Sequence, residues 1–216
     1  MKVLYSGYYP DDGYPFHSLA ETVVHAKYPA QMTEQDSALV IWGGADIAPK
    51  LYGHETSSRT SSGGQRDYAE WALMQHAIKM GIPIIGVCRG AQMGCAAAGG
   101  YLIQHVDNHA GYSHLVETYD GQTIKVNSIH HQMMFVPEGV DHEVLGWSKT
   151  HLSDQYIYQK DQTHPRPEKE LEFIYFPKIK CFAIQWHPEG MPEDCEATQF
   201  IMKEIGIKLG HHHAYT

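Results

Sequence analysis

Cysteine is scarce in this chain, which has four among 216 residues. No two of them form a C-x-x-C pair, so the sequence predicts neither a disulfide framework nor a zinc ribbon. Basic residues are also few, because 16 Lys and Arg stand against 25 Asp and Glu, giving a formal net charge of -9. Non-specific nucleic-acid binding depends on clustered cations, and this charge balance therefore argues against a nucleic-acid partner.

Long apolar runs are missing as well. No window approaches the ~18 apolar residues of a membrane span, and the first ten residues hold too short an apolar stretch for a signal peptide. We therefore expect no membrane partner and a cytoplasmic location. Residues 1–210 are expected to form a single domain, and residues 211–216, which include three consecutive histidines, a flexible tail.

The order of the predicted elements indicates an α/β fold. In the first half strands alternate with helices: strands 3–5, 38–42 and 84–87, helices 18–27, 66–80 and 91–98. This alternation is typical of a mostly parallel sheet that is covered by helices on both faces. Short strands follow at 123–126, 143–147, 171–176 and 181–185, and a last helix is predicted from about residue 192.

The segment Gly86-Val87-Cys88-Arg89-Gly90 is the strongest chemical signal. It is the G-x-S-x-G nucleophile elbow with cysteine in place of serine, and it lies between a predicted strand and a predicted helix. A sharp turn there exposes the sulfur, the flanking glycines avoid collisions, and the helix amino terminus favours the attacking thiolate. The alternative is that Cys88 is a buried structural cysteine in a glycine-rich turn.

The segment His187-Pro188-Glu189 follows the last predicted strand. In an extended segment the side chains of residues i and i+2 point the same way, and proline disfavours a helical conformation at the residue before it. Glu189 can then orient His187, and His187 can activate Cys88. By itself this tripeptide is more often a plain strand end, but the elbow in the same chain favours the catalytic interpretation.

An acyl-transfer enzyme also needs donors for the oxyanion. The backbone N–H of Arg89 follows the nucleophile and is one candidate. The paired glycines Gly43-Gly44 can offer another, because a side chain there would obstruct close approach. Paired glycines after a strand are more often a simple turn.

Four sequence blocks together resemble the class I glutamine amidotransferase superfamily, and within it the γ-glutamyl-γ-aminobutyrate hydrolase branch of the γ-glutamyl hydrolases. The blocks are Gly43-Gly44-Ala45-Asp46 with Pro49 and Leu51-Tyr52-Gly53, then Gly86 to Gln92, Asn127 to Gln132, and Gln185 to Glu189. The resemblance spans residues 39–200. It implies a three-layer, flavodoxin-like α/β sandwich and cleavage of a γ-glutamyl amide through a γ-glutamyl thioester that water hydrolyses.

The resemblance also implies roles for individual residues. It makes Cys88 the nucleophile, His187 the base and acid, and Glu189 the group that orients His187. Further residues are implied around the substrate: Gly44 and Arg89 as oxyanion donors, and Gln92, Ser128 and His130 near the bound glutamyl group. No cofactor is implied. The chain departs from the family at Trp42, where members usually carry proline.

Three histidines have a spacing that occurs in metal sites. His105, His109 and His114 form H-x₃-H-x₄-H, but no cysteine or acidic pair nearby in the sequence completes a ligand set. We therefore predict no metal site, and interpret these histidines as surface or substrate-lining residues. The cysteines other than Cys88 are interpreted as packing residues.

Three functions are compatible with these residues. The first is a stand-alone hydrolase of a small-molecule γ-glutamyl substrate, and the second is a glutaminase subunit that supplies ammonia to a separate synthetase. The third is a binding or regulatory protein without catalysis, since a fold does not fix function. The set of Cys88, His187 and Glu189 argues against the third, and the resemblance to the hydrolase branch favours the first. The sequence leaves open the leaving amine and whether the chain forms a homo-oligomer.

Overall fold

The computed structural model describes residues 2–6, 14–62 and 64–210, so the tail expected at 211–216 lies outside the described residues. Most strands in these ranges belong to one sheet with the order β2-β1-β3-β4-β13-β12-β10-β7-β8. Their bounds are β1 Lys2–Ser6, β2 Thr22–His25, β3 Ala38–Ile41, β4 Ile84–Val87, β7 Ala110–Thr118, β8 Thr123–Ile129, β10 Glu143–Ser148, β12 Leu171–Phe176 and β13 Cys181–Ile184. Two small sheets pair β5 (Tyr101–Ile103) with β9 (Met133–Phe135) and β6 (His105–Val106) with β11 (Tyr156–Ile157).

The large sheet has a parallel part and an antiparallel part. The neighbours from β2 to β13 pair in parallel, whereas β12, β10, β7 and β8 continue the sheet in antiparallel order. The expected α/β fold with parallel strands at its centre is therefore confirmed. The parallel strands β3, β4 and β13 are neighbours, so the segments that leave their carboxyl ends meet at one edge of the sheet.

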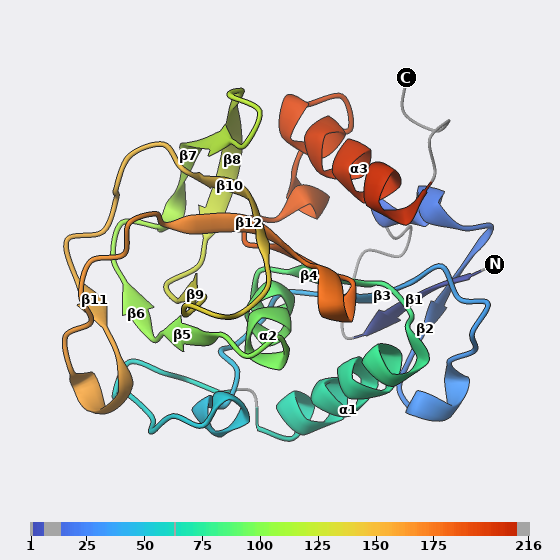
Figure 1. The fold of residues 1–216 in the computed structure, drawn as a ribbon, viewed down its shortest axis with the longest axis horizontal. Helices are drawn as coiled ribbons and strands as arrows, with labels where there is room; N and C mark the ends of the chain where they lie inside the picture. Colours follow the sequence, from blue (N-terminus) through green and yellow to red (C-terminus); the bar gives the residue numbers. More distant parts are fainter. Residues whose placement is uncertain (1, 7–13, 63, 211–216) are drawn as a thin grey trace.

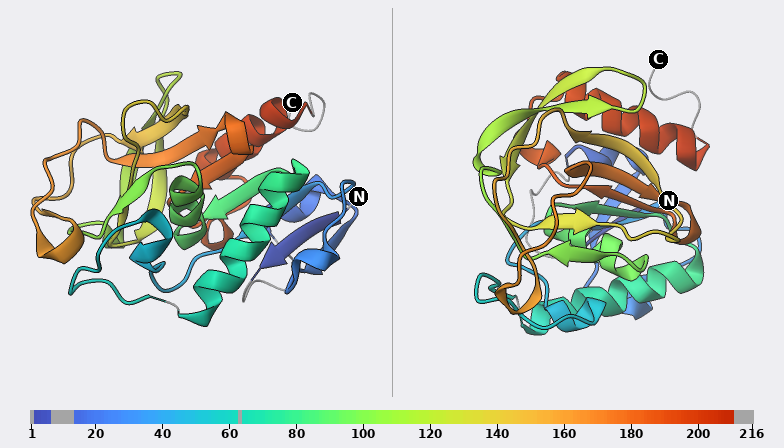
Figure 2. Two further views of the ribbon diagram at one scale, coloured as in Figure 1. Left: turned by 60° about the horizontal axis from the view of Figure 1, so that its bottom comes forward. Right: turned by 60° about the vertical axis from the view of Figure 1, so that its left-hand side comes forward.

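Helices cover both faces of the sheet. Figures 1 and 2 show α1 (Gln65–Met80) and α2 (Arg89–Ala97) on one side and α3 (Glu196–Leu209) on the other. Alternate residues of a strand serve the two cores: Leu4 packs in the cluster that contains Leu73 of α1, whereas Val3 and Tyr5 pack with Phe200 of α3. In the described part of the chain, each helix is too short or too polar to cross a bilayer.

The prediction of a helix at residues 18–27 is wrong. Phe16–Leu19 forms a single 3₁₀ turn, and Thr22–His25 forms β2, which pairs in parallel with β1 at the edge of the sheet. Three consecutive β-branched residues, Thr22 to Val24, favour extended backbone. Because an edge strand is largely exposed here, it carries no buried run that would have marked it as a strand.

Two element boundaries also differ from expectation. The last helix was expected from about residue 192, but α3 begins at Glu196, and Pro192 opens a turn that the N–H of Cys195 closes with a hydrogen bond of 3.2 Å. Strand β7, Ala110–Thr118, precedes the first of the short strands expected from residue 123. The first four residues of β7 are exposed, so no alternation of apolar and polar residues marks them.

Candidate active site

Cys88 lies at the junction of β4 and α2. Its backbone has a φ of 50° and a ψ of -105°, a conformation that residues other than glycine rarely adopt. A Cβ at Gly86 would lie 2.4 Å from the carbonyl oxygen of Gly90, and a Cβ at Gly90 would lie 1.8 Å from the carbonyl oxygen of Ile41. Only glycine fits at both positions, and the turn has the strained geometry of a nucleophile elbow.

His187 follows β13, the strand next to β4 in the sheet. Its Nδ1 lies 2.7 Å from Oε1 of Glu189. The sequence predicted an extended segment here, but a 3₁₀ turn at Pro188–Gly190 brings the carboxylate to the imidazole instead. A Cβ at Gly43 would lie 2.6 Å from Cε1 of His187 and 3.5 Å from Cβ of Cys88, so both side chains flank the same glycine.

The charge state of His187 follows from these neighbours. Burial opposes its protonation, but the neighbouring Cys88 and Glu189 outweigh burial and raise the pKa of His187 to about 10. The imidazole is therefore protonated at neutral pH. A neighbouring positive charge and a helix amino terminus are typical surroundings of reactive cysteines.

Asn127 of β8 fixes the backbone of His187. Its Nδ2 donates to the carbonyl oxygen of His187 at 2.8 Å, and its Oδ1 accepts from the N–H of His187 at 2.9 Å. The sequence placed Asn127 in a family block but gave it no role. The two hydrogen bonds show that it positions the imidazole through the main chain.

The loop after β3 carries the expected oxyanion donor Gly44. Gly44 has a φ of 140°, and a Cβ there would lie 2.3 Å from Nη1 of Arg66. Nη2 of Arg66 donates to the carbonyl oxygen of Gly43 at 3.0 Å. In a trans peptide the C=O and the following N–H point in opposite directions, so the N–H of Gly44 points away from Arg66.

The side chain of Arg89 anchors the elbow to α1. Arg89 is buried and forms ion pairs with Asp67 and Glu70, and Glu70 also accepts hydrogen bonds of 3.1 Å from Arg66 and Ser6. Sequence analysis considered only the backbone N–H of Arg89 and missed this network. A signal was present, because Asp67 and Glu70 are three residues apart on the helix and share its buried side.

The expected substrate-binding residues Gln92, Ser128 and His130 are all buried. Nε2 of Gln92 donates to the carbonyl oxygen of Gln132 at 3.2 Å and lies 3.5 Å from Oε1 of Gln185. Nδ1 of His130 lies 3.0 Å from the same carbonyl oxygen of Gln132, so Gln92 and His130 meet there. Ser128 donates to the carbonyl oxygen of His109, whose ring packs against that of His130.

A buried cluster of histidines and glutamates joins β7, the end of β8 and the start of β12. The sequence showed no acidic pair near His109 and His114, but Glu172 of β12 and Glu170, which precedes that strand, reach them from about 60 residues farther along the chain. His130 joins them, and its full burial lowers its pKa. His105 lies apart from the cluster, in contact with His131 and Arg59.

The other cysteines differ from Cys88 in their surroundings. Burial raises the pKa of Cys95 to about 12 and also raises the pKa of Cys181, so both remain neutral thiols. Cys195 is partly exposed, and its Sγ lies 3.2 Å from Oγ1 of Thr198. Their interpretation as packing residues fits these positions.

Comparison with known proteins gives several relatives. A Mycobacterium tuberculosis protein that is named provisionally as a glutamine amidotransferase is 36% identical over 118 residues, which cover 50% of this chain and 38% of that protein. Protein NtpR of Enterococcus hirae is 29% identical over 168 residues, 72% of this chain and 68% of that protein. The carbamoyl phosphate synthase small chain of Chlorobaculum tepidum is 28% identical over 124 residues, 57% of this chain and 30% of that protein. The matched part is thus less than half the length of two of these relatives.

Solved structures of other proteins have a similar fold. The structure of PurLQS from Thermotoga maritima superimposes with a TM-score of 0.62 at 12% identity, covering 96% of this chain and 98% of that chain. At this identity the similarity shows the fold alone. Residues 24–189 match the Peptidase C26 family, which indicates a hydrolase or amidotransferase. The chain therefore belongs to the Peptidase C26 family, within the class I glutamine amidotransferase-like superfamily.

Proposed function

We propose that this protein hydrolyses a γ-glutamyl amide bond through a γ-glutamyl thioester on Cys88. The observation that carries the proposal is the arrangement of three side chains. Cys88 stands in a strained turn at the amino terminus of α2, next to a protonated His187 whose Nδ1 is 2.7 Å from Glu189. This is the arrangement that activates a cysteine nucleophile for acyl transfer.

The proposed reaction has two halves. In the first, Sγ of Cys88 attacks the γ-carbonyl carbon, and the backbone N–H groups of Gly44 and Arg89 stabilise the oxyanion. His187 then gives its proton to the leaving amine as the C–N bond breaks. In the second half, His187 takes a proton from water, the hydroxide attacks the thioester, and the C–S bond breaks to release glutamate and restore the thiolate.

We propose different roles for the three expected substrate-binding residues. Gln92 follows the nucleophile by one helical turn, and we keep it as the candidate contact for the glutamyl group. Ser128 and His130 are as buried as Gln92, and we propose a positioning role for them because of their place in the chain. They flank the end of β8, the strand whose Asn127 holds the backbone of His187.

The test is release of free glutamate from glutamine and from a panel of γ-glutamyl amines. We expect one of these substrates to be turned over by the wild type and left intact by Cys88→Ala, and that substrate names the leaving amine. Cys195→Ala is the matched control, because Cys195 is a partly exposed cysteine outside the site. Turnover that persists in Cys88→Ala would refute the mechanism.

A second candidate is a glutaminase subunit that supplies ammonia to a synthetase. The observation that favours it is the similarity to a protein named as the small chain of carbamoyl phosphate synthase. In that case the chain alone would release glutamate from glutamine weakly, and a synthetase partner would raise the rate.

The third alternative is a binding protein without catalysis. It predicts that no panel substrate is cleaved and that a thiol alkylator at neutral pH leaves Cys88 unmodified. Rapid alkylation of Cys88 without turnover of the panel would instead direct the search to a partner.

A further inference from the structure

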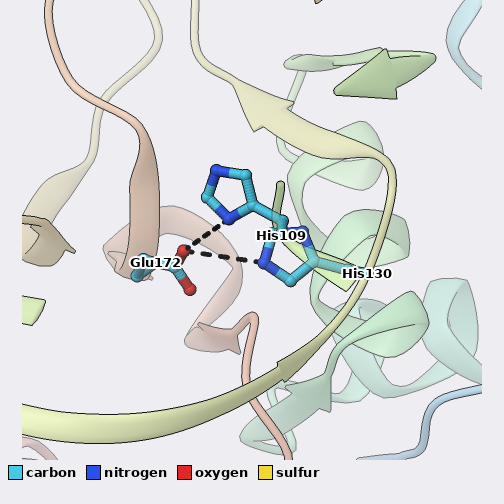
Figure 3. A group of neighbouring side chains, drawn as sticks. All are labelled: His109, His130 and Glu172. Carbon is cyan, nitrogen blue, oxygen red and sulfur yellow. Dashed lines mark ion pairs between the residues drawn. The ribbon is translucent and has the colours of Figure 1, made fainter. Parts of the chain in front are cut away.

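Three side chains from distant parts of the chain converge on one buried point. Figure 3 shows His109, His130 and Glu172 turned toward one another, and each is at most 3% exposed. One ligand-type atom from each lies within 4.8 Å of the other two. His109 precedes β7, His130 follows β8, and Glu172 belongs to β12, so the point joins three strands of the antiparallel part of the sheet.

Ring nitrogens of both imidazoles face Glu172 without a hydrogen bond. Nε2 of His109 lies 3.2 Å from Oε2 of Glu170, and Nδ1 of His130 lies 3.0 Å from the carbonyl oxygen of Gln132. Nδ1 of His109 and Nε2 of His130 have no hydrogen-bond partner within the described residues. A ring nitrogen that carries no proton can donate its lone pair to a cation.

Glu170 is held in the manner of a carboxylate that orients a metal-binding histidine. Its Oε2 accepts the N–H of Leu152 at 2.8 Å, and its Oε1 accepts the N–H of Ser153 at 3.0 Å and the hydroxyl of Tyr156 at 2.8 Å. Histidine ligands commonly donate their second ring N–H to such an anchored carboxylate, which fixes the tautomer and the ring orientation.

The negative charge of two buried carboxylates also favours binding of a cation. Glu170 and Glu172 are both buried, and in the contacts of the described residues neither carboxylate pairs with Lys or Arg. Oε2 of Glu172 and Nε2 of His130 have no hydrogen-bond partner within the described part of the chain. Buried charges in proteins are paired or bind metals, because an isolated charge is costly to remove from water.

The spacing of the inner atoms fits a tetrahedral ion. Nδ1 of His109 and Nε2 of His130 each lie 3.5 Å from Oε1 of Glu172. Bonds of about 2.0–2.2 Å in tetrahedral geometry separate ligand atoms by about 3.4 Å. Nε2 of His114 lies 3.0 Å from the same carboxylate oxygen and holds Glu172 from outside this group of three.

We propose that His109, His130 and Glu172 bind one divalent ion of the zinc class. Two imidazoles and a carboxylate are ligands that zinc accepts, and a buried, closed site is typical of a structural ion. The ion would fasten the β7–β8 hairpin to β12. Because Asn127 of β8 holds His187, and the N–H of Gln185 donates to the carbonyl oxygen of Glu172 at 2.8 Å, the ion would also steady the strand ends that carry His187.

The experiment measures metal bound per chain, and it must exclude two other binders. Cys88 with His187, and the sequence His211 to His213, can each hold zinc. The full chain is therefore prepared with Cys88→Ala and with alanine at 211–213. This background chain is unfolded with a chelator, refolded with or without Zn²⁺ or Co²⁺, desalted, and analysed for metal content, visible absorption and thermal unfolding.

We expect one Zn²⁺ per background chain and a higher unfolding temperature with Zn²⁺ than with chelator. Bound Co²⁺ should show visible bands without a thiolate charge-transfer band. His130→Gln and Glu172→Gln should each lose stoichiometric binding, whereas His105→Gln should keep it, because His105 lies outside the cluster.

Two results would overturn the proposal. One is a folded background chain that binds no stoichiometric Zn²⁺ or Co²⁺, in which case the cluster is held by protons alone. The other is unchanged binding in a folded His130→Gln chain. If Glu172→Gln fails to fold, the background chain and His130→Gln still decide the question.

Discussion

At the scale of single residues, the site depends on holding Cys88 in a conformation that its side chain disfavours. A residue in a sparsely populated region of φ and ψ costs of the order of 1–3 kcal/mol and persists only where its surroundings fix it. The N–H of Cys88 donates to the carbonyl oxygen of Ile184 at 2.7 Å, and the carbonyl oxygen of Cys88 accepts from the N–H of Gln92 at 3.0 Å. The elbow is thus fixed by the sheet on one side and by α2 on the other.

The protonated His187 predicts the reactivity of Cys88. Replacing His187 by Asn removes the positive charge beside the sulfur, and an ordinary thiol is only a few per cent ionised at pH 7. Alkylation of Cys88 by iodoacetamide at pH 7, followed by mass spectrometry of its peptide, should therefore slow by about tenfold or more in His187→Asn. The difference should shrink as the pH rises toward 10, where His187 loses its proton and thiols ionise unaided.

His131→Asn is the matched control for this measurement. The hydrogen bond to Asp46, at 3.0 Å, raises the pKa of His131, but its contacts are with Asp46 and His105. Its loss should leave the alkylation rate of Cys88 unchanged. Equal rates in the wild type and in His187→Asn would contradict the ion-paired site.

Local motifs could be predicted at this scale because the residues that form them are close together in the sequence. The glycines at 86 and 90 and the carboxylate two residues after His187 are such cases. The roles of Asn127 and Arg66 could not be predicted, since each acts on a residue at least 23 positions away through the main chain. A single sequence gives no spacing rule for contacts of that kind.

At the scale of elements, three neighbouring parallel strands build the site. The chain leaves β3 at the paired glycines, β4 at Cys88 and β13 at the segment that leads to His187. The central strands were predictable because burial on both faces requires continuous apolar runs. The edge strand β2 was not, because its four residues are largely exposed and carry no buried apolar run.

The anchoring of α2 to α1 gives a prediction on stability. Arg89→Met leaves Asp67 without an ion-pair partner among the described residues and Glu70 with Arg66 alone, and breaking a buried pair in this way costs about 3–5 kcal/mol. Urea unfolding followed by circular dichroism should show this loss, and Asp67→Asn with Glu70→Gln in the same chain should recover most of it.

An exposed ion pair serves as the control. Nζ of Lys160 lies 3.5 Å from Glu55, and both side chains are more than half exposed. Lys160→Met should change the free energy of unfolding by less than about 1 kcal/mol. If Arg89→Met were as mild as Lys160→Met, the buried network would not hold the elbow in place.

At the scale of the whole molecule, one sheet separates two hydrophobic cores. Trp42 and Trp186 lie in the core beneath α3, whereas Leu73, Met74 and Met93 lie in the core beneath α1 and α2. The strands between them contribute side chains to both cores, so neither core can open without exposing the other face of the same strands. We propose on this basis that residues 1–210 form one cooperative domain.

Cooperativity predicts a single unfolding transition. Tryptophan fluorescence reports on Trp42 and Trp186 in the core beneath α3, on Trp71 at the core beneath α1 and α2, and on Trp147 of β10. Far-ultraviolet circular dichroism reports on all helices and strands. The two signals should give the same midpoint and the same slope in urea. Separate midpoints would show that the antiparallel part or one of the cores unfolds on its own.

At this scale the sequence did not predict which distant residues come together. The histidines at 109 and 130 and the glutamate at 172 meet only because β7, β8 and β12 share one sheet. Sequence spacing grouped His105 with His109 and His114, whereas the fold directs His105 toward His131. A ligand set that is split over more than 60 residues has no local pattern.

The central claim is that a glutamyl group passes through Cys88, and hydroxylamine tests it most directly. When the protein turns over two γ-glutamyl amides with different leaving amines, hydroxylamine competes with water for a shared thioester. We predict γ-glutamyl hydroxamate and glutamate in one ratio for both substrates, with both products lost in Cys88→Ala. Glutamate without hydroxamate, or a ratio that changes with the leaving amine, would show that water attacks the bound amide and would contradict the thioester.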